Sequence, residues 1–444
     1  MDRRDFLKIA SCTGLSVVAP SAFGGNGLAD KPRASFAPYT GTLVVTVNAG
    51  GGWDPTSFCD PKGAKSESDP NPMNGSYLTE EIEQIGNIRY APLPYASLFN
   101  DTAMQLGLTY SMKTFFEKYY ERLCIINGLD VETNGHDTGS RSTWSGRLAE
   151  GFPSIAAFAA GSFGKEQPMA YMSFGGYAET AGVAPRVRAA GNAINVLGRL
   201  AYPQRIDPNN ELSGFHHDKV QEQIDIAQIG RDQALATNQG LPKIRNAINA
   251  LFVARSGSNE LKRLQEFLPE TLEQGLRGQA QLVCAAYKAG ICISANLDIG
   301  GFDTHGDHDA SQIPQLLSML DGVDFLMDEA ERQGIADKVL VAMGSDFGRT
   351  PFYNAGMGKD HWSISSMMFM GPGIPGNTVI GSTDEQHNAY GVTAALATDT
   401  SETARKIHPQ DVHQAMRRVL GVENSELAAM FPLDLTGDPL PLFG

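Results

Sequence analysis

Short apolar runs that alternate with helical or glycine-rich stretches constrain the fold of this chain more than any other feature. Such runs are typical of buried strands, and their alternation with helices is the pattern of an α/β fold. The expected strands are residues 42–48, 123–127, 169–174, 291–297, 339–343 and 366–370. The expected helices are residues 112–122, 186–199, 218–236, 243–254, 272–288, 313–333 and 409–420.

Polar clusters follow four of these expected strands. Asp54 comes after the first strand, His136 after the second, Asp303 after the strand at 291–297, and Asp346 after the strand at 339–343. Ligands of open parallel sheets bind where strands end and loops begin. The four strand ends could therefore converge on one site.

The densest of these clusters reads Asp-Thr-His-Gly-Asp-His-Asp and spans residues 303–309. It offers Asp303, His305 and His308, and the later Gly-Lys-Asp-His-Trp stretch adds His361. Carboxylate oxygens and imidazole nitrogens suit zinc, manganese, iron or calcium. The alternative is a solvated loop in which an aspartate caps the helix that follows.

The first residues favour export. The sequence Arg-Arg-Asp-Phe-Leu-Lys at residues 3–8 matches a twin-arginine signal, and a weakly apolar run follows it. We interpret residues 1–24 as the signal peptide, residues 25–40 as a linker and residues 41–444 as a single domain. The twin-arginine (Tat) translocase would deliver the folded protein, with any metal already inserted, to the periplasm or the cell exterior. A lipobox ending at Cys12 is a weaker alternative, because few apolar residues precede it.

The charge balance excludes one class of partner. The chain has a formal net charge of -15, and removing the signal takes away three basic and two acidic side chains, which leaves -16. Phosphate backbones are bound by clustered Lys and Arg, so we expect no nucleic-acid partner. No later segment offers the roughly twenty apolar residues that span a bilayer, so we expect no transmembrane segment in the mature chain.

Five motifs together resemble a known family of Tat-exported bacterial proteins. They are Gly-Gly-x-Asp ending at Asp54, Asn-Gly-His at 134–136, Gly-Phe-Asp-Thr-His at 301–305, Ser-Asp-Phe-Gly-Arg-Thr-Pro at 345–351, and Gly-Lys-Asp-His-Trp at 358–362. The family is known as domain of unknown function 1501 and is placed in the alkaline-phosphatase and sulfatase superfamily. The resemblance covers nearly the whole mature chain.

The resemblance implies an alkaline-phosphatase-like three-layer α/β sandwich with a mostly parallel central sheet and two adjacent metal ions. A Ser, Thr or formylglycine nucleophile would attack a phosphate or sulfate ester in line. Asp54 resembles the superfamily's first-strand metal carboxylate, and Asp346 resembles the Asp of its Ser-Asp-His-Gly motif. Asp303 with His305 or His308 resembles its Asp-x-x-x-His element, and His361 resembles its late metal-binding histidine.

Two departures from the superfamily pattern leave the nucleophile open. Phe347 stands where a phosphatase has a metal-binding His, and the Cys-Asp-Pro-Lys-Gly stretch at 59–63 lacks the Arg of the sulfatase sequon. His136 could replace the lost ligand, so that an activated water attacks. Alternatively, Thr138 or Ser140 could attack covalently.

Several of these residues also have purely structural interpretations. Asp54 could begin an Asx turn before Pro55, and His136 could bind a backbone carbonyl. Asp346 and His361 could form a structural hydrogen-bonded pair. Arg141 and Arg349 could each pair bidentately with an anionic oxygen, as substrate-binding groups do.

Two functional hypotheses follow. The first is an exported hydrolase that uses one or two divalent ions to cleave a small anionic ester or an anionic polymer. The second is a non-catalytic protein of binding, assembly or maturation on the same scaffold. The loss of a histidine at Phe347 and the unclear nucleophile favour the second.

Overall fold

The computed structural model describes residues 37–93, 110–164, 167–188, 201–202, 204–207, 210–238 and 258–444. The predicted signal peptide, residues 25–36 of the predicted linker and the predicted helix at 243–254 lie outside these residues. Among the described helices, none is both long enough and apolar enough to cross a membrane.

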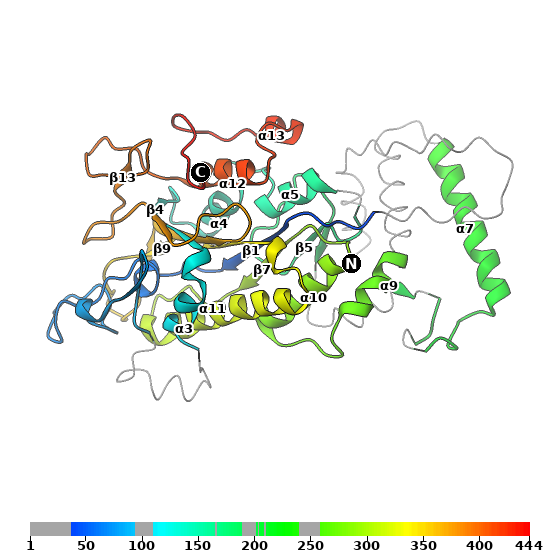
Figure 1. The fold of residues 1–444 in the computed structure, drawn as a ribbon, viewed down its shortest axis with the longest axis horizontal. Helices are drawn as coiled ribbons and strands as arrows, with labels where there is room; N and C mark the ends of the chain where they lie inside the picture. The colour runs from blue at the N-terminus through cyan, green and yellow to red at the C-terminus, as the bar shows by residue number, and fades with distance from the viewer. Residues whose placement is uncertain are drawn as a thin grey trace.

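An eight-stranded sheet with the order β12-β4-β11-β8-β1-β7-β5-β6 forms the centre of the fold (Figure 1). Its strands are β1 (Leu43–Ala49), β4 (Leu123–Asp130), β5 (Tyr171–Ser173), β6 (Arg186–Arg188), β7 (Ser294–Ile299), β8 (Val339–Ser345), β11 (Ile364–Met370) and β12 (Thr378–Ile380). β1 pairs in parallel with both β7 and β8. Among the described strands of this sheet, only β11 runs in the opposite direction, antiparallel to both β8 and β4. The carboxyl ends of β1, β4, β7 and β8 therefore lie along one edge.

Alternate residues of the strands enter two different cores. In β8, Val339 and Val341 pack into one core together with residues of α10 and α11. Leu340 and Ala342, which point the other way, pack into a second core with residues of α12. This period of two is what a sheet covered on both faces requires.

The helices form the two outer layers (Figure 1). One face carries α3 (Met112–Tyr119), α10 (Gly275–Lys288) and α11 (His308–Arg332), and the other carries α4 (His136–Ser145), α5 (Ile155–Phe163) and α12 (Pro409–Val419). The mixed α/β fold with a mostly parallel central sheet that the sequence predicts is thus confirmed.

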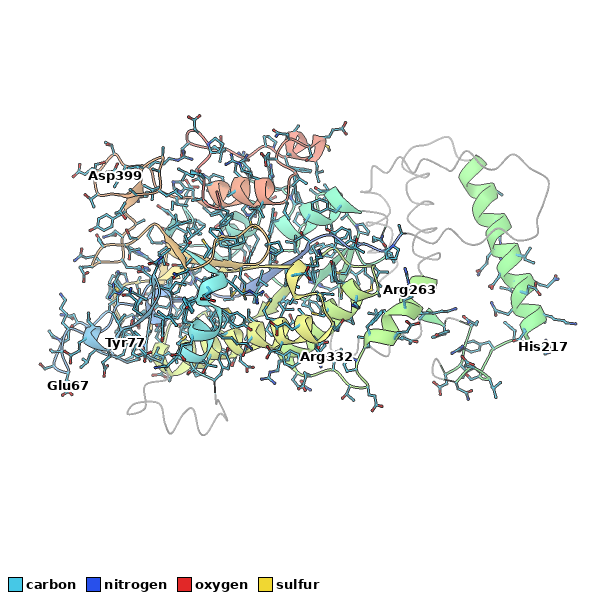
Figure 2. All side chains as sticks on the ribbon, in the orientation of Figure 1. Glu67, Tyr77, His217, Arg263, Arg332 and Asp399 are labelled. Atoms are coloured by element: carbon cyan, nitrogen blue, oxygen red, sulfur yellow. The ribbon has the colours of Figure 1, made fainter. Side chains whose placement is uncertain are left out.

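Smaller elements surround these layers. The remaining helices in the described part of the chain are α7 (Asp218–Asn238), α9 (Ser258–Phe267), α13 (Glu426–Met430), η1 (Pro55–Ser57), η2 (Thr79–Glu81), η3 (Tyr120–Arg122) and η4 (Ala336–Lys338). The short sheets pair β2 (Glu83–Ile85) with β3 (Ile88–Tyr90), β9 (Gly348–Arg349) with β10 (His361–Trp362), and β13 (Gly391–Val392) with β14 (Thr398–Asp399). The side chains drawn in Figure 2 fill the space between the sheet and its helices.

All six predicted strands are confirmed, and one predicted helix is wrong where the structure describes it. Residues 186–188 of that helix form the edge strand β6, paired in parallel with β5, and residues 189–199 lie outside the described part. The helix predicted at 313–333 begins earlier, at His308. Pro314 lies inside this helix, although proline normally belongs to a helix's first turn. Its position hides the earlier start from a sequence-based prediction.

Candidate metal centre

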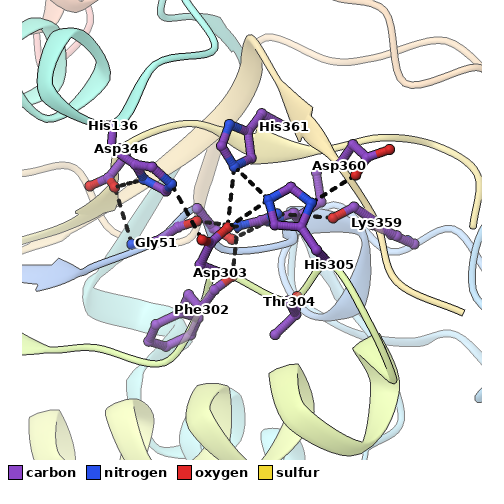
Figure 3. Close-up of polar contacts among 12 residues, drawn as sticks. Gly51, His136, Phe302, Asp303, Thr304, His305, Asp346, Lys359, Asp360 and His361 are labelled. Atoms are coloured by element: carbon purple, nitrogen blue, oxygen red, sulfur yellow. Dashed lines mark hydrogen bonds and ion pairs between the residues drawn. The ribbon is translucent and has the colours of Figure 1, made fainter. Parts of the chain in front are cut away.

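Four loops meet at the carboxyl edge of the sheet, as the polar clusters at the strand ends predict. The loop after β1 brings Gly51, the loop after β4 brings His136, the loop after β7 brings Asp303, and β8 leads directly to Asp346 (Figure 3). His136, Asp303 and Asp346 are thus brought together from three strands.

His136 is the first residue of α4, and Asp346 fixes its ring. Its Nδ1 atom lies 2.9 Å from Asp346 Oδ2, and its Nε2 atom lies 3.5 Å from Asp303 Oδ2. The Asp346 carboxylate also accepts hydrogen bonds from the Gly51 N–H (3.1 Å) and from the Ser140 hydroxyl (2.7 Å). Because a carboxylate only accepts, Asp346 binds the Nδ1 proton, and a neutral His136 ring then has its Nε2 lone pair on the side of Asp303.

His361 lies beside His136, has the same arrangement and faces the other carboxylate oxygen of Asp303. Its Nδ1 atom lies 2.7 Å from the carbonyl oxygen of Asn134, and its Nε2 atom lies 3.2 Å from Asp303 Oδ1. A carbonyl oxygen is also only an acceptor, so Nδ1 again holds the proton of the neutral ring. In that neutral form, the Nε2 lone pair of His361 is also on the side of Asp303.

His305 completes the cluster. Its Nδ1 atom lies 2.7 Å from Asp360 Oδ1, and its Nε2 atom lies 3.0 Å from both His361 Nε2 and Asp303 Oδ1. The hydrogen bond with His305 lowers the pKa of Asp360, which keeps that carboxyl group an anionic acceptor. Three imidazoles thus direct Nε2 atoms towards one carboxylate.

Arg349 holds Asp303 in place. Its guanidinium group is fully buried and donates to Asp303 Oδ1 at 2.8 Å. The guanidinium group also donates to the carbonyl oxygens of Gly51, Gly52, Phe302 and Lys359. Burial would raise the pKa of Asp303, but the hydrogen bond and the positive charge of Arg349 outweigh it and lower the pKa to about 2. Asp303 is therefore an anion at neutral pH.

This donor set fits a divalent metal ion. The ligand atoms of His136, Asp303 and His361 all lie within 4.8 Å of one another. Neutral histidines whose lone pairs face each other repel unless a cation lies between them. Histidines that bind metals typically donate their other N–H to a carboxylate or a backbone carbonyl, as His136, His305 and His361 do here. Imidazole nitrogens suit zinc, iron or manganese better than calcium, which prefers oxygen.

Phe347 packs against this cluster without contributing a ligand. Its ring centroid lies 4.3 Å from that of His361 and 5.0 Å from that of His136. The side chain is fully buried. Phe347 thus supports two imidazole planes from the position where the superfamily pattern has a histidine.

Asp54 and His308 belong to a different cluster. Both side chains are fully buried, and His308 Nε2 lies 3.0 Å from Asp54 Oδ2. Lys359 Nζ donates to the same oxygen at 2.6 Å, and the N–H and hydroxyl of Thr56 donate to Asp54 Oδ1. Burial would raise the pKa of Asp54, but Lys359 and His308 hold it well below its ordinary value. Asp54 therefore caps η1, as the Asx-turn interpretation expects, and pairs with a lysine.

The remaining predicted site residues point in other directions. The Thr138 hydroxyl lies 2.7 Å from that of Thr133 and donates to the carbonyl oxygen of Gly135. Arg141 donates to the carbonyl oxygen of Leu148 and pairs with Glu150 at 3.4 Å. Of the candidate nucleophiles, only the Ser140 hydroxyl is bound to Asp346.

The family assignment rests on a match along most of the chain. The family model described as "Protein of unknown function (DUF1501)" matches residues 42–434. The chain belongs to the DUF1501 family. No curated protein matches it.

Several solved structures are similar to this DUF1501 protein at low sequence identity. Ps i-CgsB in complex with k-i-k-neocarrahexaose is 9% identical with a TM-score of 0.38, over 91% of this chain and 76% of that chain. BT1596, a 2-O GAG sulfatase, is 12% identical with a TM-score of 0.32, over 88% and 73%. The lipoteichoic acid synthase LtaP from Listeria monocytogenes is 8% identical with a TM-score of 0.37, over 91% and 74%. The family match, and not these low TM-scores, carries the assignment.

Sequence reasoning missed the partners that hold the histidine cluster and Asp54 of this DUF1501 protein in place. Asp360 orients His305, the carbonyl of Asn134 orients His361, and Lys359 pairs with Asp54. The Lys-Asp pair lies directly before His361 in a motif that the sequence did single out. Polar residues next to a candidate ligand were thus the available signal.

Proposed function

We propose that this protein binds a divalent metal ion at His136, Asp303 and His361, with His305 beside them, and uses it to hydrolyse an anionic ester. The observation that supports this best is the orientation of the three imidazoles. Each donates its Nδ1 proton to a fixed acceptor and directs Nε2 towards Asp303. When bound, the ion would act as a Lewis acid that polarises the ester oxygen.

The chain's own residues have defined roles in this proposal. Asp346 and Asp360 orient two of the histidines, and Arg349 orients Asp303. Ser140 lies four residues after His136 on α4 and holds Asp346, so we assign it a positioning role. Water is then the nucleophile, which agrees with the alternative in which His136 replaces the lost metal ligand and an activated water attacks.

We infer a phosphate or sulfate ester as the substrate from the motif resemblance to the superfamily. Two of the similar structures are those of a 2-O GAG sulfatase and a lipoteichoic acid synthase. The side chains of His136 and Asp303 are 42% and 48% exposed. Such an open site is accessible to an anionic polymer as well as to a small ester.

We further propose that the protein works after export. The twin-arginine motif at residues 3–8 supports the Tat route to the periplasm or the cell exterior. Residues 41–444 would then form the single mature domain. Replacing both Arg3 and Arg4 by Lys should retain the protein in the cytoplasm. Unchanged export of that variant would contradict the route.

The second candidate function is non-catalytic binding or assembly, and two observations favour it. Arg349 is fully buried and Arg141 is paired with Glu150, so neither guanidinium is directed at an anionic substrate. Asp54, which we expected to be the first-strand metal carboxylate, is neutralised by Lys359. In this second function, the metal ion at His136, Asp303 and His361 would stabilise a binding surface.

Hydrolysis assays with metal removal and return distinguish the two functions. The exported protein would be tested on aryl phosphate, aryl sulfate and sulfated or phosphodiester polymers, beside His361→Ala and the control His217→Ala. His217 is an exposed residue before α7 (Figure 2). Turnover that a chelator abolishes and added metal restores, and that only His361→Ala lacks, supports hydrolysis. Full metal occupancy without turnover on any substrate supports the non-catalytic function.

A further inference from the structure

A fully buried lysine lies between the candidate metal centre and the polar turn after β1. The Lys359 side chain has no exposed surface, and neither has that of Asp54. Its backbone N–H donates to the carbonyl oxygen of Thr304, and its carbonyl accepts from Arg349. Lys359 is thus fixed at both its backbone and its side chain.

The ammonium group of Lys359 donates to two oxygen atoms of kinds that also bind metal ions, and a histidine nitrogen lies beside one of them. Nζ lies 2.6 Å from Asp54 Oδ2 and 3.1 Å from Asn74 Oδ1. His308 Nε2 lies 3.0 Å from the same Asp54 oxygen. A carboxylate oxygen, an amide oxygen and an imidazole nitrogen form a conventional ligand set for a divalent ion.

His308 can change its tautomer and keep its hydrogen bond with Thr304. Its Nε2 atom faces the Asp54 carboxylate and so carries the proton, while Nδ1 lies 2.7 Å from the Thr304 hydroxyl. A hydroxyl can either donate or accept. If a metal ion replaced the ammonium group, His308 could donate from Nδ1 to Thr304 and offer its Nε2 lone pair to the ion.

We propose that the ammonium group of Lys359 is a permanent second cation, which occupies a site of Asp54, Asn74 and His308 that would otherwise bind a divalent metal ion. The protein therefore needs one metal ion, at the histidine cluster, and none at Asp54. The inference rests on the proposed function only for that first ion. A tethered cation keeps Asp54 neutralised at any metal concentration and fixes the backbone next to Asp360 and His361, so Lys359 is a positioning residue.

Metal content of Lys359→Ala, compared with the wild type and with Lys359→Met, tests this proposal. Alanine removes the ammonium group and leaves space, whereas methionine removes the charge and fills the space with an apolar chain. After equilibration with zinc and removal of loose metal, Lys359→Ala should hold one more ion per chain than the wild type. Lys359→Met should hold no additional ion.

Thermal unfolding supplies a second readout. Zinc should raise the unfolding midpoint of Lys359→Ala by more than it raises that of the wild type or of Lys359→Met. A folded Lys359→Ala with the wild-type metal count would overturn the proposal. A Lys359→Ala variant that remains unfolded in the presence of zinc would also overturn the proposal, because the proposal expects zinc to take the place of the ammonium group. If the wild type bound no metal ion, the proposed function would be contradicted. The difference in metal content between Lys359→Ala and the wild type would still test the present proposal.

Discussion

The Nε2 atoms of His305 and His361 lie 3.0 Å apart, while the Nδ1 atom of each ring is held by an oxygen acceptor on its other side. Both Nε2 atoms also face Asp303 Oδ1, at 3.0 and 3.2 Å. Two neutral imidazoles cannot hydrogen-bond to each other through two lone pairs. The relationship therefore calls for a cation, either a shared proton or a metal ion.

Replacing Asp360 by alanine should weaken metal binding without abolishing it. Asp360 accepts the Nδ1 proton of His305 and so fixes its ring. Loss of such an orienting group typically reduces metal affinity by about 10–100-fold. Competition titration with a zinc chelator measures this change. Glu67→Ala, which removes an exposed carboxylate elsewhere, should leave the affinity unchanged (Figure 2).

Substitution of Ser140 and of Thr138 tests whether either hydroxyl is a covalent nucleophile, and we expect that neither is. Ser140→Ala removes one hydrogen bond to the charged Asp346 and should lower ester turnover by about 10–100-fold, the equivalent of roughly 1.5–3 kcal/mol. Thr138→Ala should leave turnover nearly unchanged. A complete loss in Ser140→Ala, together with a burst of product in the wild type, would assign Ser140 as the nucleophile instead.

Removing the charge of Lys359 should destabilise the fold strongly in the absence of added metal. Lys359→Met leaves the Asp54 carboxylate buried without its partner, which typically costs about 3–5 kcal/mol. The double variant Asp54→Asn with Lys359→Met has no unpaired charge and should recover part of that loss. Denaturant unfolding of both variants measures the difference. Equal stability of the single and double variants would show that the pair is not coupled.

Burial of His413 should make the stability depend on pH in the acidic range. Its side chain is buried, Nε2 lies 2.9 Å from the carbonyl oxygen of Thr143, and burial lowers its pKa to about 4. The unfolded chain, with a histidine pKa near 6.5, binds this proton more readily, so protonation favours unfolding. Stability should fall by about 1.4 kcal/mol per pH unit as the pH drops from about 6.5 to about 4.

The difference between wild type and His413→Gln isolates this effect. The amide N–H of glutamine can replace the donor to Thr143 but does not titrate. The unfolding midpoint of the wild type should therefore drop more steeply than that of His413→Gln over this range. Parallel curves would show that His413 does not contribute to the acid sensitivity.

The sequence predicts the convergence of His136, Asp303 and Asp346 because each follows a strand and parallel strands end at one edge. The antiparallel β11 does not disturb this, since β4 and β8 on either side of it share one direction. The partner of Asp54 is beyond such reasoning. Lys359 is 305 residues away in the chain, and the sequence around it does not show whether its ammonium group is buried or exposed.

The edge strand β6 and the ring of Phe347 show a similar limit of sequence-based prediction. The stretch Arg-Val-Arg at 186–188 has no strong pattern of its own, and pairing with β5 decides its conformation. From the sequence alone, Phe347 likewise indicates only that a metal-binding histidine is missing. The structure gives it a positive role, because its ring supports the imidazoles of His136 and His361.

Elemental analysis of the exported protein, with His361→Ala and His217→Ala prepared in parallel, tests the central claim most directly. We predict one zinc, iron or manganese ion per chain in the wild type and in His217→Ala, and little or none in His361→Ala, with all three proteins folded. A wild type without bound metal after equilibration with these ions would contradict the account, as would a His361→Ala that retains its metal ion at wild-type affinity.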